Sequence, residues 1–154
     1  MNRRLFLFPF VTMLVSFAFG DVRAQNVGKQ VVSSPDAPEA IGPYSQAIKS
    51  GKTVYLSGQI AIDPKTKQLL ANASIEDQTR RVLENLKAVL AADGLTMDSI
   101  VSATVFLTDL TDFAKMNDVY ATYFKNTPPA RATVEVAHLP RSAKVEISAI
   151  AVHP

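Results

Sequence analysis

The chain has 154 residues, of which 16 are basic, 14 are acidic and none is cysteine. This length fits one domain with a single hydrophobic core. The lack of cysteine excludes disulfide bonds and a thiol nucleophile, and the two histidines, His138 and His153, are not spaced as metal ligands. The sequence therefore predicts neither a metal site nor a cofactor.

Residues 1–24 have the features of a secretory signal peptide. A basic start is followed by a short apolar stretch and by the tripeptide Val-Arg-Ala, which a signal peptidase can read. We expect cleavage before Gln25, a periplasmic or secreted protein, and a single mature domain of residues 25–154. The alternative is an uncleaved anchor, although the apolar stretch is shorter than the roughly 20 residues of a spanning helix.

Cleavage would change the charge of the protein. Residues 1–24 hold three arginines and one aspartate, so 13 of the 16 basic and 13 of the 14 acidic residues remain. The mature domain then has a formal net charge of zero and no excess of Lys and Arg to neutralise phosphates. We therefore expect neither a nucleic acid nor, after cleavage, a membrane as its partner.

Three strands are predicted before the first helix. Residues 30–33 form a short β-like opening that ends at a proline-containing loop. Residues 41–63 indicate two strands joined near Gly51, where the sequence Ser-Gly-Lys is a hairpin signal.

The first helix is expected between Ser74 and Gly94. Ser74 is a favourable N-cap, Asp77 gives a weaker form of the capping box, and Gly94 ends the helix. The apolar residues of its buried stripe recur at helical spacing: Ile75, Val82, Leu83, Leu86, Val89 and Leu90.

A strand and a second helix follow. Residues 100–107 predict a strand, and residues 109–125 predict a helix. Val101, Ala103, Val105 and Leu107 are expected to share one face of the strand. The helix is expected to bury Phe113, Met116, Val119, Tyr120, Tyr123 and Phe124.

The next strand begins at Arg131 and alternates. Arg131, Thr133 and Glu135 share one face, while the other face, with Ala132, Val134 and Val136, is expected to enter the core. A guanidinium held on a rigid strand suits two-pronged recognition of a carboxylate or phosphate. The alternative is an ordinary solvated strand arginine.

Residues 144–152 form the last predicted strand. The apolar face has Val145, Ile147, Ala149 and Ala151, and the other face has Lys144, Glu146, Ser148 and Ile150. A short connection favours antiparallel neighbours, so the polar faces of the last two strands are expected on one side of a sheet. The resulting polar cluster would contain Arg131, Thr133, Glu135, Glu146 and Ser148. The alternative is a solvated hairpin face on which Glu146 pairs with Lys144 or Arg141.

The predicted order is three strands, a helix, a strand, a second helix and two strands. The layer argument gives an α+β sheet with both helices on one face. The other face, expected to carry Arg131, would be left open and would find a ligand or a partner. Self-association with a polar cleft at the seam is the economical arrangement.

Five segments resemble the Rid family of reactive-intermediate deaminases, also called the YjgF family, over residues 30–152. They are GPYSQA (42–47), SGQI (57–60), TVFLTDLTDFAKMNDVY (104–120), PARATVEVAHLP (129–140) and KVEISAIAV (144–152), in the family order. The resemblance implies a chorismate-mutase-like α+β subunit with a mixed six-stranded sheet. It also implies a homotrimer with three sites at the subunit seams.

The resemblance further implies an enzyme that hydrolyses 2-imino acids and their enamine tautomers to 2-oxo acids and ammonia. Arg131 matches the residue that binds the substrate carboxylate, and Glu146 matches the carboxylate that positions or activates water. An imine carbon is already electrophilic, so this chemistry requires no metal or covalent nucleophile.

The remaining pocket positions follow from the same resemblance. Tyr44, Ser57 and Asn117 match these positions, with Asn117 expected to bind substrate. The hydroxyl group of Tyr44 or Ser57 can hold the water or the imine nitrogen by a hydrogen bond. Thr133 stands where relatives carry cysteine or a small polar residue. Gly58 is expected to allow close approach of the backbone to the ligand.

Two departures affect the substrate range. Pro128 stands where relatives often have phenylalanine, and Ser148 replaces a second acid common in the last strand. The family also contains members without imine hydrolase activity. The alternative function is therefore a non-catalytic trimer that binds small carboxylates or protein partners.

Overall fold

A computed structural model describes residues 28–154. The predicted signal peptide and its cleavage site lie outside the described residues. No helix between residues 28 and 154 is long and apolar enough to cross a membrane.

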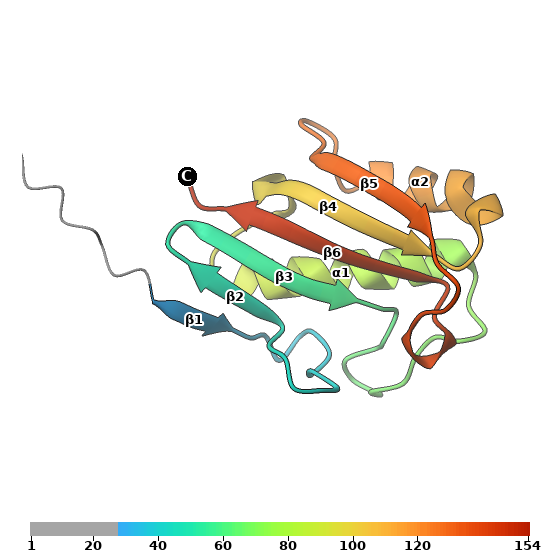
Figure 1. Cartoon of the computed structure of the whole chain (residues 1–154), viewed down its shortest axis with the longest axis horizontal. Coiled ribbons are helices and arrows are strands. Elements are labelled where there is room, and N and C mark those ends of the chain that lie inside the picture. The colour runs from blue at the N-terminus through green and yellow to red at the C-terminus, as the bar shows by residue number, and fades with distance from the viewer. Residues whose placement is uncertain (1–27) are drawn as a thin grey trace, which may run out of the picture.

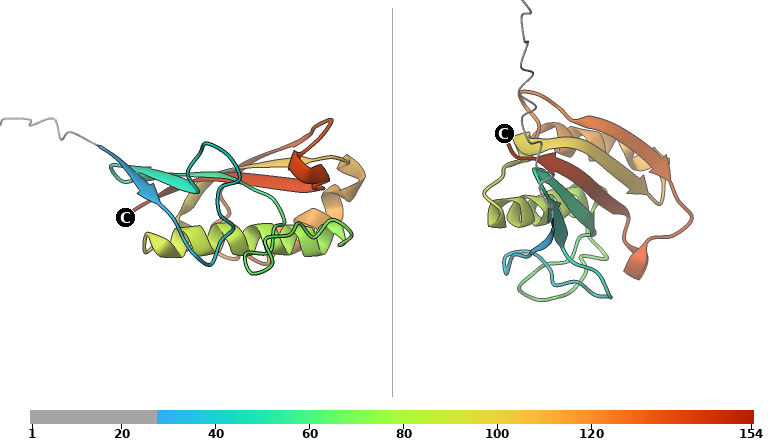
Figure 2. Two further views of the ribbon diagram at one scale, coloured as in Figure 1. Left: turned by 90° about the horizontal axis from the view of Figure 1, so that it is seen from below. Right: turned by 60° about the vertical axis from the view of Figure 1, so that its left-hand side comes forward.

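Within these residues, six strands form one mixed sheet, and two α-helices cover one of its faces (Figures 1 and 2). The predicted order of elements and the α+β fold are confirmed. The elements are β1 (Lys29–Val32), β2 (Ala47–Ser50), β3 (Thr53–Gln59), α1 (Ile75–Ala92), β4 (Ile100–Leu107), α2 (Phe113–Ala121), β5 (Ala130–Glu135) and β6 (Val145–Val152).

Helix α1 forms as the sequence predicts. The Ser74 hydroxyl accepts a hydrogen bond of 3.1 Å from the backbone N–H of Asp77, which satisfies one free donor of the first turn. The helix ends before Gly94, whose positive φ of 72° suits glycine. All six residues of the predicted stripe are buried, each contributing roughly 1.5–3 kcal/mol through burial of apolar surface.

The sheet order is β1-β2-β3-β6-β4-β5, so the prediction that the last two strands are neighbours is wrong. β4 lies between them, parallel to β5 and antiparallel to β6. α2 connects β4 to β5 across the covered face of the sheet, and this crossover returns the chain parallel to β4. The connection from β5 to β6 over residues 136–144 is longer than a hairpin loop and passes beyond β4.

The face predicted for Arg131 is also wrong. Arg131 pairs in register with Ala103, and Thr133 pairs with Val105, so both point to the side covered by the helices. Glu135 shares that side because it pairs with the buried Leu107. Alternation with period two shows which residues share a face but not which face is buried.

The predicted core residues of β5 are instead on the open face of the sheet. Ala132 and Val134 are exposed, and Val136 lies beyond the end of the strand. Glu146 pairs with Phe106 on this open face. Ser148 shares the face, so the five residues of the predicted polar cluster divide between the two sides of the sheet.

The second half of the chain differs from prediction in two further details. The pairing of β4 with β6 is irregular between Ile100 and Ser102, so Val101 is 45% exposed and Ile100 is buried in its place. The predicted helix over residues 109–125 begins with a 3-10 turn, and α2 itself has nine residues. Met116, Val119, Tyr120 and Phe124 are buried, whereas Phe113 is 40% exposed and Tyr123 is partly buried.

The open face of the sheet has apolar side chains. Val31, Ile48, Tyr55 and Ile150 pair in register across four strands, and Val31 and Tyr55 are 68% and 51% exposed. Val134 on β5 is 43% exposed on the same face. The predicted uncovered face is therefore present, but it carries an apolar row rather than Arg131, and such a surface is typical of an interface.

Candidate active site

One cluster of the predicted residues lines an open pocket of about 300 Å³ at the end of β3. β3 contributes Ser57 and Gly58, and β6 contributes Glu146. The loop before β2 adds Tyr44 beside them. Apolar walls from Ile41, Ile60 and Pro140 complete the pocket.

Glu146 is the acidic group of this pocket. Burial raises the pKa of its half-buried carboxyl group above the ordinary value. It forms no ion pair among residues 28–154, and Lys144 is occupied by the carbonyl of Ala73 at 3.0 Å. A carboxylate with a raised pKa is a better general base than an exposed one.

Gly58 makes room for this carboxylate. The pairing of β3 with β6 is irregular between Leu56 and Gln59, at the level of Gly58. A Cβ atom on Gly58 would lie 3.0 Å from Cγ of Glu146 and would collide with its carboxyl group. The group that lies closest to Gly58 is therefore the Glu146 side chain of the same subunit.

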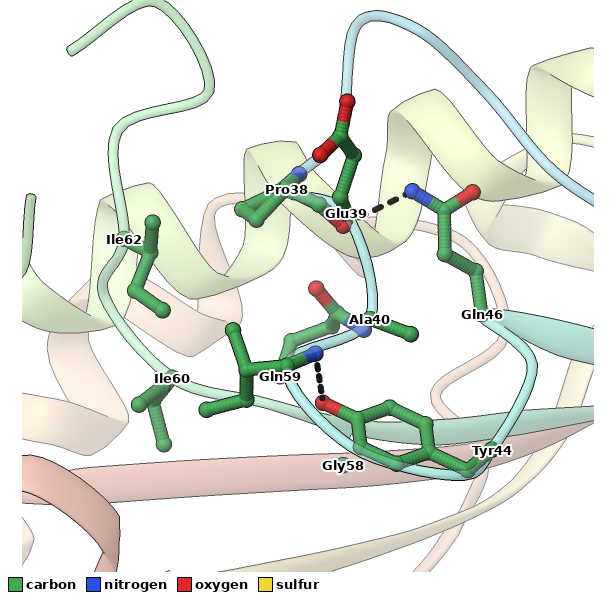
Figure 3. A pocket seen from close by; sticks show the side chains of 10 residues that line it. Pro38, Glu39, Ala40, Tyr44, Gln46, Gly58, Gln59, Ile60 and Ile62 are labelled. Carbon is green, nitrogen blue, oxygen red and sulfur yellow. Dashed lines mark hydrogen bonds between the residues drawn. The ribbon is translucent and has the colours of Figure 1, made fainter. Parts of the chain in front are cut away.

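The two hydroxyl groups of the pocket have opposite hydrogen-bond roles. The Ser57 hydroxyl donates to the carbonyl of Ser45 at 2.7 Å, which uses its proton. The Tyr44 hydroxyl accepts from the backbone N–H of Ile41 at 3.2 Å, so its own proton remains available (Figure 3). Toward a ligand, Ser57 is thus an acceptor and Tyr44 is a donor.

The loop that carries Tyr44 is held by Gln46, a residue that the sequence interpretation missed. Its buried amide oxygen accepts from the backbone N–H of Ser34 at 2.6 Å. Its amide nitrogen donates to the carbonyl of Pro38 at 2.7 Å (Figure 3). An amide at the start of a strand, within the segment GPYSQA, was the available signal. A buried amide that bonds the backbone fixes the loop in one conformation.

The second cluster lies on the helix side of β5. The Arg131 guanidinium donates from Nη2 to Oδ1 of Asn117 at 2.9 Å. Its Cζ lies 4.5 Å from the ring centroid of Tyr120 and 5.8 Å from that of Phe113. Thr133 follows on the same side of the strand. No carboxylate in the described part of the chain pairs with Arg131, so it is able to bind an external anion.

The two clusters do not meet within one subunit. Tyr44, Ser57 and Gly58 lie with Glu146 on β3, β6 and the adjoining loop. Asn117 and Thr133 lie with Arg131, on the other face of the sheet from Glu146. The predicted site residues therefore form two separate clusters within one subunit.

The histidines lie outside both clusters. His138 is exposed, and Nε2 of His153 lies 2.6 Å from Oδ2 of Asp93 at the end of α1. Among residues 28–154, no three His, Asp or Glu side chains are grouped closely enough to hold a metal ion.

Known proteins resemble the chain over almost all of the described residues. Residues 34–153 match the family described as Endoribonuclease L-PSP. The 2-iminobutanoate/2-iminopropanoate deaminase of Mus musculus is 45% identical over 124 residues, covering 80% of this chain and 91% of the mouse protein.

Solved structures share the fold. A protein of unknown function from the conserved Rid family of Yersinia pestis has a TM-score of 0.79 and 51% identity, covering 82% of this chain and all of that one. TdcF of E. coli, with bound serine, has a TM-score of 0.78 and 44% identity, covering 81% and 99%. These likenesses define a chorismate-mutase-like α+β subunit. Within that class the chain belongs to the Rid family, which confirms the resemblance seen in its sequence.

Proposed function

We propose that the protein hydrolyses reactive 2-imino acids and their enamine tautomers to 2-oxo acids and ammonia. The observation that carries this proposal is the Arg131 guanidinium, which is held by Asn117 and pairs with no carboxylate among residues 28–154. A planar cation fixed in this way fits the two oxygens of a substrate carboxylate. The name of the mouse relative, an imino-acid deaminase, supports the same reaction.

The proposed active form is a homotrimer with one site at each subunit seam. Arg131 and Glu146 lie on opposite faces of the sheet in one subunit, so a complete site requires a second copy. The apolar row on the open face, which includes Tyr55, supports self-association that would bury it. Each seam would place Arg131 of one subunit opposite the Glu146 pocket of the next.

The first half of the reaction adds water to the imine. Arg131 binds the carboxylate and thereby places the imine carbon in the neighbouring pocket. Glu146 takes a proton from water as the water oxygen attacks that carbon. The electron pair of the C=N bond moves to the protonated nitrogen, which gives a neutral carbinolamine.

The second half expels ammonia. Glu146 returns its proton to the amino nitrogen, which converts that nitrogen into a leaving group. The C–N bond then breaks as Glu146 removes the hydroxyl proton and the oxygen forms the new C=O bond. The products are a 2-oxo acid and ammonia. Ammonia then takes the proton from Glu146, which restores the carboxylate.

The hydroxyl groups of Ser57 and Tyr44 can form hydrogen bonds with the reacting nitrogen and oxygen. Ser57 is already a donor to Ser45, so its oxygen can accept an N–H of the protonated imine. Tyr44 already accepts from Ile41, so its proton can be donated to the attacking oxygen. The Ser57 interaction is strongest while the nitrogen is positively charged, which is before water is added and again before ammonia leaves.

A direct assay tests the proposal. An amino-acid oxidase would generate the 2-imino acid, and loss of its absorbance would be followed with and without the protein. We expect Arg131→Ala to abolish hydrolysis and Arg131→Lys to restore it poorly, because an ammonium lacks the two-pronged geometry. Arg80→Ala, which removes an exposed arginine from α1, should retain activity. Full activity of Arg131→Ala would place the reaction elsewhere.

A second candidate function is a non-catalytic trimer that binds small carboxylates. The solved TdcF structure with bound serine favours it, because serine carries a carboxylate. Binding of a 2-oxo acid by calorimetry, with no acceleration of imine hydrolysis over buffer, would support this function instead of catalysis.

We also propose that the protein is exported and cleaved before Gln25. The basic and apolar start of the chain supports this proposal. N-terminal sequencing of protein from the extracytoplasmic fraction should begin at Gln25, whereas recovery of Met1 from membranes would indicate an anchor.

A further inference from the structure

Tyr120 is a buried tyrosine beside Arg131 that the proposed mechanism does not use. Its side chain is 5% exposed, and its hydroxyl has no hydrogen-bond partner among residues 28–154. Burial raises the pKa of Tyr120, and both the charge of Arg131 and a hydrogen-bonding contact with its guanidinium oppose that rise. The guanidinium therefore lies beside the hydroxyl, but their contact lacks the full geometry of a hydrogen bond in the unliganded subunit. Buried hydroxyl groups are seldom left unpaired, because this costs stability.

One face of α2 is directed at Arg131. Phe113, Asn117 and Tyr120 occur at positions i, i+4 and i+7, which share a helix face. Asn117 contacts one edge of the guanidinium at 2.9 Å, and Cζ of Arg131 lies over the Tyr120 ring, 4.5 Å from its centroid. A cation held by an edge contact and a face contact has little freedom to tilt.

The geometry points to Tyr120 as a positioning residue for Arg131. Its ring supports the guanidinium from one side, and its hydroxyl accepts a guanidinium N–H when a bound carboxylate fixes Arg131 in place. A guanidinium has five N–H donors, so a two-pronged carboxylate leaves donors free for Asn117 and Tyr120. The inference rests on the proposed role of Arg131 in binding the substrate carboxylate.

A purely structural tyrosine would behave differently. Removing an unpaired buried hydroxyl leaves stability unchanged or improves it, because nothing is lost in the unliganded subunit. If the Tyr120 hydroxyl only fills space in the hydrophobic core, its removal will not change ligand affinity either. Tyr120→Phe separates these roles, since it keeps the ring under Arg131 and removes only the oxygen.

Tyr123 on the same stretch of chain provides a matched control. Its hydroxyl donates to Oε1 of Glu84 at 2.8 Å, so its hydrogen bond is already satisfied and lies away from Arg131. Tyr123→Phe should lower the melting temperature and leave carboxylate binding unchanged. Tyr120→Phe should weaken carboxylate binding without lowering the melting temperature.

The experiment uses the whole mature protein and two readouts. Calorimetry would measure the Kd of 2-oxobutanoate, a product-like carboxylate, and the oxidase-coupled assay would measure KM and kcat. Tyr120→Phe should weaken Kd and raise KM by about 3- to 10-fold, as expected for one hydrogen bond, with kcat changed by less than about twofold. Tyr120→Leu, which also removes the ring, should weaken Kd by more than about tenfold.

The outcomes separate this inference from the proposed function. Unchanged Kd and KM in Tyr120→Phe would overturn the role of the hydroxyl, as would a loss of stability without a loss of affinity. Binding of 2-oxobutanoate by a wild-type protein that does not hydrolyse imines would reject catalysis while leaving the Tyr120 comparison valid. A wild-type protein that does not bind the carboxylate would overturn both.

Discussion

Glu146 lies half-buried over Gly58 and has no charged partner within residues 28–154, which makes its protonation the main electrostatic variable of the pocket. Burial raises its pKa, so the base form appears only as the pH rises through that raised value. We expect kcat/KM to rise with pH above the usual range of a glutamate. Glu146→Gln should retain carboxylate binding and lose both the rate and this pH dependence.

The raised pKa of Glu146 also affects the stability of the fold. Activity is expected to rise with pH, whereas this contribution to stability falls. Protonated Glu146 is favoured in the folded state, so its stabilising contribution is present at low pH and is lost as the pH rises through the raised pKa. Glu146→Gln should therefore melt at a higher temperature than the wild type at pH 7, and the difference should disappear near pH 4. Glu39→Gln, at an exposed ion pair with Lys67, should have little effect at either pH. A wild type that is more stable than Glu146→Gln at pH 7 would contradict the shift.

Gly58 allows a test of carboxylate placement without altering any polar atom. The Cβ atom of Gly58→Ala would displace the Glu146 carboxyl group, which is the mobile end of a side chain. We expect activity to fall at least about tenfold because the base is misplaced, with little change in melting temperature. Gly28→Ala, where nothing lies within 4 Å of the new atom, is the control and should be neutral. Normal activity in Gly58→Ala would show that this placement is not needed.

Side-chain type and motif gave Arg131 and Glu146 as candidate site residues without any structure. Their placement in the sheet was predicted less well than the elements that carry them. Gln46 was missed because its role is to bond the backbone of a loop distant in sequence. Burial and long-range hydrogen bonds arise from tertiary packing, which a local pattern does not encode.

At the scale of elements, the turn between β5 and β6 has two consecutive residues in the left-handed region of backbone conformation. Arg141 and Ser142 have positive φ values of 57° and 60°, which side chains other than glycine and asparagine adopt at a cost. Ser142→Gly should raise the free energy of unfolding by about 0.5–1 kcal/mol, measured by chemical denaturation. Ser142→Ala retains the steric conflict and should give no such gain, so equal effects of the two substitutions would refute the strain.

The elements themselves show what sequence periodicity can predict. α1 was predicted to within about two residues because its cap, stripe and terminating glycine all agree. β5 was recognised as a strand, but its face and neighbour were wrong. β5 is an edge strand, and α2 covers its helix side. Polar and aromatic side chains of α2 contact Arg131 there. Alternation alone does not predict such a contact.

At the scale of the whole molecule, the open sheet face determines whether the proposed trimer forms. Tyr55→Glu places a charge in the apolar row and should give monomers without imine hydrolase activity, because burying an unpaired charge is costly. Ala91→Glu adds the same charge to the exposed side of α1 and should remain trimeric. Light scattering on the wild type should give about three subunit masses, and a stable wild-type monomer at micromolar concentration would refute the assembly.

Arg131 and Glu146 lie on opposite faces of one sheet. In the proposed trimer each chain would therefore contribute its arginine to the seam with one neighbour and its glutamate to the seam with the other. Two inactive variants should then complement each other. When Arg131→Ala and Glu146→Gln chains are unfolded together in equal amounts and reassembled, about a quarter of the seams of a closed ring would pair an intact arginine with an intact glutamate. Activity would return from a mixture in which no single chain can act.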